Sequence, residues 1–377
     1  MSDSSQIADS KDAADSSANR DGLPATLHFL RNPGSYGAPL QKLCCIETHM
    51  SWVFLLSDRV FKLKKPVRFP FLDFSSLQAR EFYCREELRL NARLAPGVYL
   101  GLMALQRSNG KLRLMPESQL AGGETLDWLV VMRRLPSERM LDQLIAHGML
   151  QDQEIDALVT RLGDFYLHAS SAPIEAESYL SRFTSQQALA REILLRPQFA
   201  LRDAVLALTR FDLCLSQAAA LLRQRAAQAR VLEGHGDLRP EHVCLLQPPV
   251  VIDCLEFNPQ MRQVDPFDEI SYLALESQMV AAGLASGNGG DSAGQAQGQR
   301  IAERLISGLA AALDERPDPA LLHLYTAYRA ILRARLAMAH LLDVTPRTPE
   351  KWAPLAQRYL DRALLAMQQF SATMHGG

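Results

Sequence analysis

The sequence lacks several patterns, and each absence excludes a class of protein. No CxxC pair occurs among the 6 cysteines, so neither a zinc ribbon nor a thioredoxin-type redox site is indicated. No GxxxxGK[ST] motif occurs, which excludes a P-loop nucleotide site in this chain. An apolar run of about 18 residues and a signal-peptide pattern are also missing, so we expect a cytoplasmic protein that does not bind a membrane.

An excess of charge of one sign is missing too. The 377 residues include 40 Lys and Arg against 42 Asp and Glu, which gives a net charge of -2. A protein that holds nucleic acid by its overall charge carries a basic excess, so we expect no nucleic-acid partner. The 47% of hydrophobic residues is ordinary for a globular chain that is long enough for two lobes. The six cysteines are expected to be reduced and buried.

Two segments of low complexity border the parts that are predicted to fold. Residues 1–22 contain almost no large apolar side chains and are predicted to be a disordered tail. Residues 283–299 are rich in Gly, Ser and Gln, and we predict a flexible loop there. Between and beyond these segments, residues 23–135 are predicted to be one lobe and residues 136–375 another.

The two predicted lobes differ in their patterns. Alternating apolar residues over 42–70, and again over 99–105, 111–116 and 126–136, predict β-strands. Residues 73–95 show helical spacing, and the chain after Pro136 is mostly helical apart from one short strand pair. This order predicts an α+β, two-lobed architecture with a hinge near Met132 to Pro136.

Most of the candidate chemistry lies in residues 234–259, GHGDLRPEHVCLLQPPVVIDCLEFNP. This segment holds six polar candidates: His235, Asp237, Arg239, His242, Asp253 and Glu256. Two short strands joined by the QPP turn would bring Asp237 and Asp253 to the same end of a hairpin. Two adjacent carboxylates repel each other unless they bind a cation or divide the roles of base and metal ligand.

These residues resemble a known family. The motif HGDLRPEH is similar to the catalytic loop of kinases, and its Gly after the His is typical of aminoglycoside phosphotransferases and choline kinases. VVIDCLEF stands where that family has its metal-binding Asp segment, and DPFDEISYL resembles the D-x-x-D-L-A that follows it. Residues 45 to 370 resemble an uncharacterised bacterial branch of the aminoglycoside phosphotransferase-like family. The resemblance implies a bilobal protein-kinase-like fold, a sheet-rich N-lobe that binds ATP, and transfer of its γ-phosphate to a small-molecule acceptor.

The resemblance implies a role for each polar residue of the loop. Asp237 matches the catalytic Asp, which accepts the proton of the acceptor hydroxyl or orients that hydroxyl. Asp253 matches the Asp that holds the metal bridging the phosphates. Arg239 stands where protein kinases have a Lys near the γ-phosphate, and His235 matches a scaffold His.

One position departs from the family pattern. The family has a metal-binding Asn five residues after the catalytic Asp, and this sequence has His242 there. Imidazole is a softer ligand than an amide oxygen and suits Mn²⁺ better than Mg²⁺. Three outcomes are open: a shifted metal preference with His242 as a ligand, a metal held mainly by Asp253 and Glu256, or reduced activity.

A nucleotide site also needs a base for the phosphates. The predicted strand RVFKLKKPV offers Lys62, and Lys64 falls on the same face two residues on. The resemblance favours Lys62, with Lys64 as the alternative. It also implies a Glu partner on the following helix, for which Glu87 is preferred and Glu86 is the alternative.

The sequence also offers candidates for the other parts of the nucleotide site. No Gly-rich loop precedes Lys62, and the segment ETHMSWVFL stands in its place. Backbone N–H groups there and Ser51 are candidates for phosphate contacts. Adenine is expected to contact backbone groups at the hinge, near Met132 to Arg134. We expect Trp52 to be a core residue and not an adenine-stacking one.

A predicted helix over 320–341 carries Tyr325, Arg329 and Arg333 at intervals of four residues. The simpler interpretation is a solvated stripe on a packed helix. The alternative is a basic stripe that faces the substrate, which would favour an anionic acceptor.

Four functions remain open from the sequence. The first is an ATP-dependent kinase that uses Mg²⁺, or Mn²⁺ instead, to phosphorylate a hydroxyl of a small molecule. The second is a nucleotide-binding regulatory module that has lost catalysis. A metal-dependent phosphohydrolase would leave Lys62 and Glu87 without a role, and a kinase acting on proteins lacks a recognisable A-P-E segment after Asp253.

Overall fold

The computed structural model describes residues 23–37, 42–69, 71–120, 122–283, 292–343 and 346–376. The predicted tail of residues 1–22 therefore lies outside the described residues. The chain divides into two compact units, Met1–Arg134 and Leu135–Gly377, and we describe each by itself. The sequence predicts this boundary one residue later, after residue 135.

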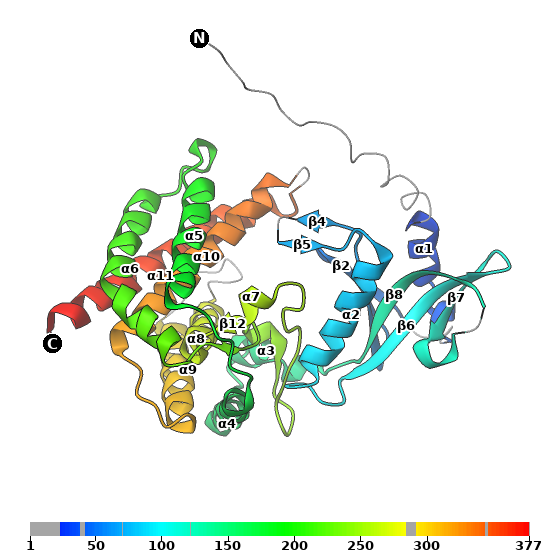
Figure 1. The fold of residues 1–377 in the computed structure, drawn as a ribbon, viewed down its shortest axis with the longest axis horizontal. Helices are drawn as coiled ribbons and strands as arrows, with labels where there is room; N and C mark the ends of the chain where they lie inside the picture. Colours follow the sequence, from blue (N-terminus) through cyan, green and yellow to red (C-terminus); the bar gives the residue numbers. More distant parts are fainter. Residues whose placement is uncertain are drawn as a thin grey trace, which may run out of the picture. The chain divides into compact units, whose positions relative to one another are not determined.

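The first unit (Figure 1, blue to cyan) is built on an antiparallel sheet of six strands in the order β1-β2-β3-β8-β6-β7. Its strands and helices are β1 (Cys44–Glu47), β2 (Ser51–Leu55), β3 (Arg59–Lys64), β4 (Arg68–Phe69), β5 (Leu72–Asp73), β6 (Tyr99–Ser108), β7 (Lys111–Pro116), β8 (Glu124–Arg133), α1 (Leu23–Leu30), η1 (Pro33–Tyr36), α2 (Leu77–Asn91) and η2 (Glu117–Gln119). The predicted strands and the predicted helix are thus present.

Alternation along β3 determines which side chains reach α2. Phe61 and Leu63 join the hydrophobic cluster that packs against α1 and η1. Val60 joins the cluster on the opposite face of the sheet, which includes Cys84 of α2. Successive side chains of a strand point to opposite faces. Lys62 and Lys64 therefore share the face of the sheet that α2 covers.

The cysteines of this unit correct one expectation. Cys84 is buried, but Cys44 is exposed and Cys45 is half-buried. Both lie on β1, which is an edge strand of the sheet and has a neighbour on one side only. An edge strand buries less of each side chain than a central one, so the prediction of burial is wrong for these two residues. All six cysteines are free thiols, as expected.

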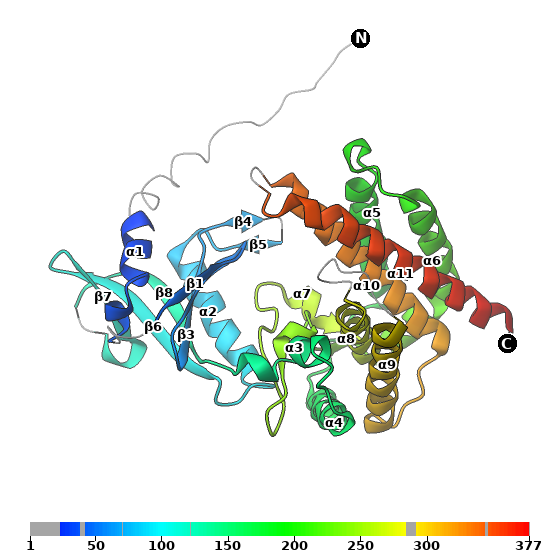
Figure 2. The same ribbon diagram turned by 180° about the vertical axis from the view of Figure 1, so that it is seen from behind.

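The second unit is mostly helical (Figure 2). Its elements are η3 (Ser137–Arg139), α3 (Leu141–Ala146), α4 (Asp152–His168), α5 (Ala176–Leu194), η4 (Pro197–Phe199), α6 (Ala204–Ala227), β9 (Leu232–Glu233), η5 (Pro240–His242), β10 (Val243–Cys244), β11 (Val250–Val251), α7 (Pro259–Arg262), β12 (Gln263–Val264), α8 (Pro266–Ala281), α9 (Ser292–Ala312), α10 (Pro319–Ala339), η6 (His340–Leu342) and α11 (Pro349–Gly376). The helix α8 is buried along most of its length and contacts α3, α9 and α10. Figure 2 shows α11 running along α10, which it contacts.

The helix α6 is long and apolar enough to cross a membrane, by length and composition only. It packs against α5, α10 and α11, and 39% of its most apolar window is buried. Core helices of soluble proteins meet the same criterion, so α6 is weak evidence for a membrane span.

The predicted loop over 283–299 is wrong for its second half. Residues 292–299 form the first turns of α9, while residues 284–291 lie outside the described part of the chain. Gly298 is buried in α9, and a Cβ added there would lie 3.0 Å from Cα of Gln278 on α8. The small residues that suggested a loop include one that allows two helices to pack closely.

Two residues of the stripe on α10 also differ from the solvated-face interpretation. Arg329 is 5% exposed and binds Asp268 of α8 through two nitrogens, at 2.7 Å each. Tyr325 is fully buried and donates a hydrogen bond to Asp265 at 3.1 Å. Both residues therefore hold α10 against the N-terminal half of α8 and are not available to solvent.

Replacing Arg329 by Met should destabilise the protein by about 3–5 kcal/mol, because Asp268 would be left buried without its partner. The matched control is Arg335→Met on the same helix, since Arg335 is only half-buried and contacts the Gln186 amide. Urea unfolding followed by circular dichroism measures both. A loss of less than about 1 kcal/mol in Arg329→Met would show that the pair does not hold the two helices together.

Candidate active site

The loop from Gly234 to Arg239 joins β9 to η5, and its backbone requires a glycine at position 236. Gly236 has φ 88°, in the left-handed region that favours glycine. A Cβ there would also lie 3.0 Å from Cβ of Leu255. Local backbone geometry thus explains why the motif has a glycine between His235 and Asp237.

The predicted hairpin follows this loop. β10 pairs with β11 in antiparallel register, with Val243 opposite Val251 and Cys244 opposite Val250. As a result, Asp237 and Asp253 both lie near the His242 ring, at 3.8 Å and 3.6 Å between the nearest nitrogen and oxygen atoms. The structure therefore brings the two predicted carboxylates together around one imidazole.

His235 is a buried, neutral residue at the base of the loop. Its Nε2 donates to the carbonyl oxygen of Ile252 at 2.9 Å, and its Nδ1 faces the backbone N–H of Asp237 at 3.3 Å. A carbonyl oxygen only accepts, so Nε2 carries the proton and Nδ1 accepts. Burial lowers the pKa of His235 to about 4, and the neighbouring His242 acts in the same direction. His235 therefore holds the loop against the segment that contains Ile252, and this is the scaffold role that the resemblance implies.

Glu269 of α8 supports the same loop, and the sequence reasoning missed it. Its carboxylate accepts the backbone N–H of His235 at 3.0 Å and also that of Gly236. The hydroxyl of Tyr166 donates to it at 2.7 Å. The sequence signal was its place in DPFDEISYL, the segment that resembles the motif following the metal-binding Asp segment.

Asp237 lies between a cation and a hydroxyl. Its Oδ2 is 3.0 Å from Arg239 Nη2, and Tyr272 of α8 donates to its Oδ1 at 3.3 Å. Burial raises the pKa of the Asp237 carboxyl, but Arg239 and His242 outweigh burial and hold it below the usual value. The side chain keeps 31% of its surface exposed. Asp237 is thus an ionised carboxylate that a ligand can reach.

The orientation of His242 follows from its hydrogen bonds. Nδ1 lies 2.8 Å from the carbonyl oxygen of Asp237, so Nδ1 is the protonated nitrogen. Nε2 therefore presents a lone pair, which accepts from Arg239 Nη2 at 3.3 Å and lies 3.6 Å from Asp253 Oδ2. If a metal replaces the Arg239 contact, this lone pair and the Asp253 carboxylate are a donor set that fits a divalent cation.

Asp253 has a strained backbone, with φ 61° in the left-handed region. Such strain in a non-glycine residue is concentrated at functional sites. Its side chain is 45% exposed. Glu256 is buried, and among the described residues it does not form a three-donor metal group with His242 and Asp253. Two protein ligands suit Mg²⁺, which takes its other ligands from phosphates and water.

In the first unit, Glu87 of α2 contacts both candidate lysines. Its Oε1 lies 3.0 Å from Lys62 Nζ and its Oε2 lies 2.7 Å from Lys64 Nζ. Lys64 is fully buried, while the Lys62 side chain is 14% exposed. Glu86 instead binds Arg89 at 2.8 Å on the outer face of α2. The structure thus joins Glu87 with both lysines; their part in nucleotide binding stays a prediction.

The remaining predicted nucleotide residues lie in the same unit. Ser51 is buried at the start of β2, and its backbone N–H donates to Thr48 Oγ1 at 2.9 Å. Met132 is buried near the end of β8, and the backbone N–H of Arg134 donates to the backbone carbonyl oxygen of Asp58 at 2.9 Å. Trp52 is 6% exposed within the core cluster, which confirms that it is a core residue.

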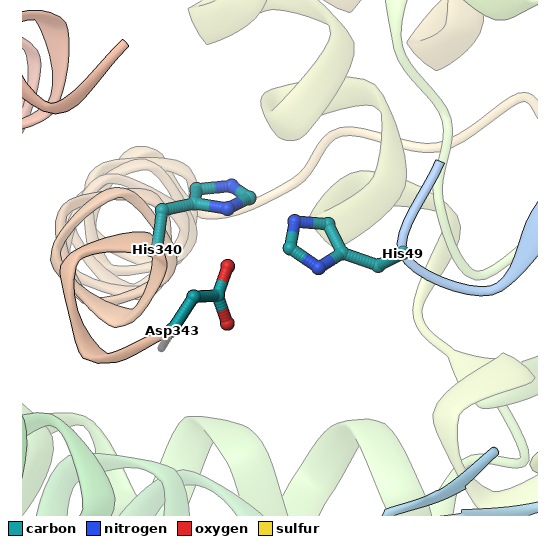
Figure 3. Close-up of side chains that lie close together, drawn as sticks. All are labelled: His49, His340 and Asp343. Atoms are coloured by element: carbon teal, nitrogen blue, oxygen red, sulfur yellow. The ribbon is translucent and has the colours of Figure 1, made fainter. Parts of the chain in front are cut away.

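Figure 3 shows the side chains of His49, His340 and Asp343, whose donor atoms form a group that could hold a metal. We assign no site to them, because His49 belongs to the first unit and the other two residues to the second. His340 stacks on Trp352 at 3.9 Å between ring centroids, which gives it a structural role in the second unit.

Comparisons with known sequences show distant relatives of unestablished function. No protein-family profile matches the chain. Uncharacterised proteins of Mycobacterium tuberculosis and Mycobacterium bovis are 26% identical over 305 residues, which cover 77% of this chain and 53% of each relative. The chain therefore spans about half the length of the curated relatives that it matches.

Comparisons with solved structures show the fold. Choline kinase from Cryptosporidium parvum is 10% identical, with a TM-score of 0.55 over 94% of this chain and 97% of that one. A choline/ethanolamine kinase family protein from Mesorhizobium loti is 12% identical, with a TM-score of 0.51 over 94% and 99%. Glucosamine kinase in complex with glucosamine, ADP and inorganic phosphate is also 12% identical, with a TM-score of 0.51 over 91% and 86%. This chain therefore has the α+β, protein-kinase-like fold of small-molecule kinases, as the sequence predicts.

Proposed function

We propose that the protein is an ATP-dependent phosphotransferase that moves the γ-phosphate to a hydroxyl of a small molecule. The observation that carries this proposal is the grouping of Asp237, Arg239, His242 and Asp253 on one loop and hairpin. The ionised Asp237 carboxylate lies next to Arg239. The Asp253 carboxylate and His242 Nε2, which could bind a metal, lie beside them. Phosphoryl transfer needs these three elements. Helix α8 holds this loop in place, because its Glu269 accepts the backbone N–H of His235.

Each residue has a separate task in this mechanism. Asp237 orients the acceptor hydroxyl and accepts its proton, which its lowered pKa allows because the carboxylate is ionised. Arg239 stabilises charge on the transferred phosphoryl group. Asp253 and His242 Nε2 would hold Mg²⁺ or Mn²⁺, which neutralises phosphate charge when bound. Lys62, oriented by Glu87, would bind the α- and β-phosphates.

Ser51 and the backbone at Met132 and Arg134 are proposed to contact the phosphates and the adenine. A small acceptor is supported by the solved structures with this fold, two of which are named for choline and glucosamine. We further propose that the protein acts in the cytoplasm, where ATP is abundant, without a nucleic-acid or membrane partner.

The test is calorimetric titration of the protein with ATP and Mg²⁺, followed by transfer of phosphate from γ-labelled ATP to hydroxyl compounds. We expect metal-dependent binding and a labelled product. Absence of ATP binding in the presence of either Mg²⁺ or Mn²⁺ would refute the proposal.

A second function has one observation in its favour. His242 replaces the Asn of the family pattern, so the chain could be a nucleotide-binding regulatory module without catalysis. In that case ATP would bind, but no acceptor would be phosphorylated. The same two measurements separate the two functions, because only the kinase gives a labelled product.

Replacing His242 by Asn should shift the metal preference towards Mg²⁺. The imidazole Nε2 beside Asp253 is a softer ligand than an amide oxygen, so the wild type should favour Mn²⁺ more. We expect the ratio of the Mn²⁺ rate to the Mg²⁺ rate to fall at least about threefold in the variant. Steady-state kinase rates with each metal give this ratio.

The control for this experiment is His168→Asn, since His168 is exposed and, among the described residues, its ring contacts Asp164 on its own helix. It should leave the metal ratio unchanged. An unchanged ratio in His242→Asn as well would assign His242 a structural role and leave Asp253 as the ligand.

A further inference from the structure

Arg333 differs from the other two polar residues of the stripe on α10. Tyr325 donates a hydrogen bond to the buried Asp265, and Arg329 forms a buried ion pair with Asp268. The Arg333 side chain is 21% exposed, whereas that of Arg329 is 7% exposed. Arg333 is therefore the member of this stripe that a ligand can reach.

The guanidinium of Arg333 is held in place from one side. Its Nε lies 3.2 Å from Glu276 Oε1 and 3.3 Å from the hydroxyl of Tyr359. Tyr359 in turn donates to Glu276 Oε1 at 2.8 Å, and its ring lies 5.5 Å from the guanidinium carbon. These contacts use Nε and fix the plane of the group. They do not use the two Nη atoms, whose paired N–H groups fit a carboxylate or a phosphate.

This guanidinium lies close to the catalytic carboxylate. Glu276, which binds Arg333, is one turn along α8 from Tyr272, so both side chains are on one face of the helix. Tyr272 donates to Asp237 at 3.3 Å. Four residues of a helix advance about 6 Å, so the two contacts leave α8 about one turn apart. Arg333 is also one of the cations that lower the pKa of Asp237 against the effect of burial.

Two further carboxylates near Asp237, those of Glu276 and Glu241, are already paired with arginines. Glu276 is buried, and burial raises its pKa; its Oε1 is occupied by Arg333 and Tyr359. Glu241 binds Arg239 at 2.5 Å. A cationic acceptor would therefore meet two arginines, whereas an acceptor with a negative group would find a charge partner in Arg333.

We propose that the acceptor is an anionic hydroxyl compound, with its hydroxyl at Asp237 and its carboxylate or phosphate bound by Arg333. This inference rests on the proposed phosphotransferase function. In the reaction, the bond from the γ-phosphorus to the bridging oxygen of ATP breaks, and a bond to the acceptor oxygen forms. The hydroxyl proton passes to Asp237, and ADP leaves. Arg333 determines specificity by binding a part of the acceptor that does not react.

The acceptor class can be measured without choosing a compound in advance. The full-length protein is incubated with a bacterial metabolite extract and ATP labelled with ¹⁸O in its γ-phosphate, and labelled products are identified by mass spectrometry. We expect acceptors that carry a carboxylate or a phosphate, and the product itself tells which. Labelled neutral or cationic acceptors would overturn the inference and leave the kinase intact. A complete absence of labelled product would refute both the kinase and this inference.

The role of Arg333 is then tested on the acceptor that is found. Arg333→Met should raise the KM for that acceptor at least about tenfold and change kcat less, because a binding contact is lost. Arg333→Lys, which keeps the charge, should recover part of this loss, and the KM for ATP should not change. Arg335→Met on the same helix is the control. An unchanged acceptor KM in Arg333→Met would refute the proposed contact.

Discussion

Asp237→Asn should abolish phosphoryl transfer while ATP binding remains nearly unchanged. The carboxylate lies 3.0 Å from Arg239 and accepts a hydrogen bond from Tyr272, so an amide of the same size fits the site. What the amide lacks is the negative charge that takes the proton of the acceptor hydroxyl. A general base contributes about 100-fold or more, and we expect kcat to fall by at least that factor.

Initial rates and calorimetric ATP titrations measure the two effects separately. Asp164→Asn provides the control, because this aspartate is 59% exposed on α4 and, within the described part of the chain, pairs with Arg161 and His168 of its own helix. It should change neither quantity. If Asp237→Asn keeps turnover within about tenfold of the wild type, the residue is not the catalytic base.

Replacing either of the two lysines that contact Glu87 should have a different effect: one replacement should weaken ATP binding and the other should destabilise the protein. Lys62 is the one that keeps an exposed part, so Lys62→Ala should weaken ATP binding at least about tenfold through loss of a phosphate contact. Lys64 is fully buried, 2.7 Å from Glu87 and over the ring of Phe74. Lys64→Met should instead destabilise the protein by about 3 kcal/mol, because Glu87 loses a buried partner.

Calorimetric ATP titration and urea unfolding are applied to both variants. Lys111→Ala is the control, since Lys111 is exposed on β7 of the same sheet. Weakened ATP binding in Lys64→Met, with a normal stability, would exchange the two roles. Unchanged ATP affinity in both variants would remove this pair of strand lysines from the nucleotide site.

The fold and the centre of the site could be predicted from the sequence because their signals are local. Alternation along β3 fixes which side chains share a face of the sheet, so Lys62 and Lys64 point the same way whatever packs on them. The short hairpin after His242 likewise determines that Asp237 and Asp253 meet, since a tight turn leaves one arrangement of its two ends. The fold class is confirmed for the same reason.

Other features depend on contacts between elements that are distant in the sequence. Glu86 and Glu87 are adjacent in an acidic helix, but about 100° of rotation separates them, and only the sheet under α2 selects Glu87 as the buried one. Gly298 similarly belongs to a helix and not to a loop, because α8 packs closely against it.

The stripe on α10 shows most clearly which features follow from the local sequence and which depend on long-range contacts. By itself, the sequence determined that Arg329 and Arg333 lie on one face of a helix, because they are four residues apart. Only the tertiary structure decided that Arg329 is paired with Asp268 in the core and that Arg333 remains partly exposed near the catalytic loop. Helical periodicity defines a face, but the charge partners that neutralise it come from α8, more than fifty residues earlier in the chain.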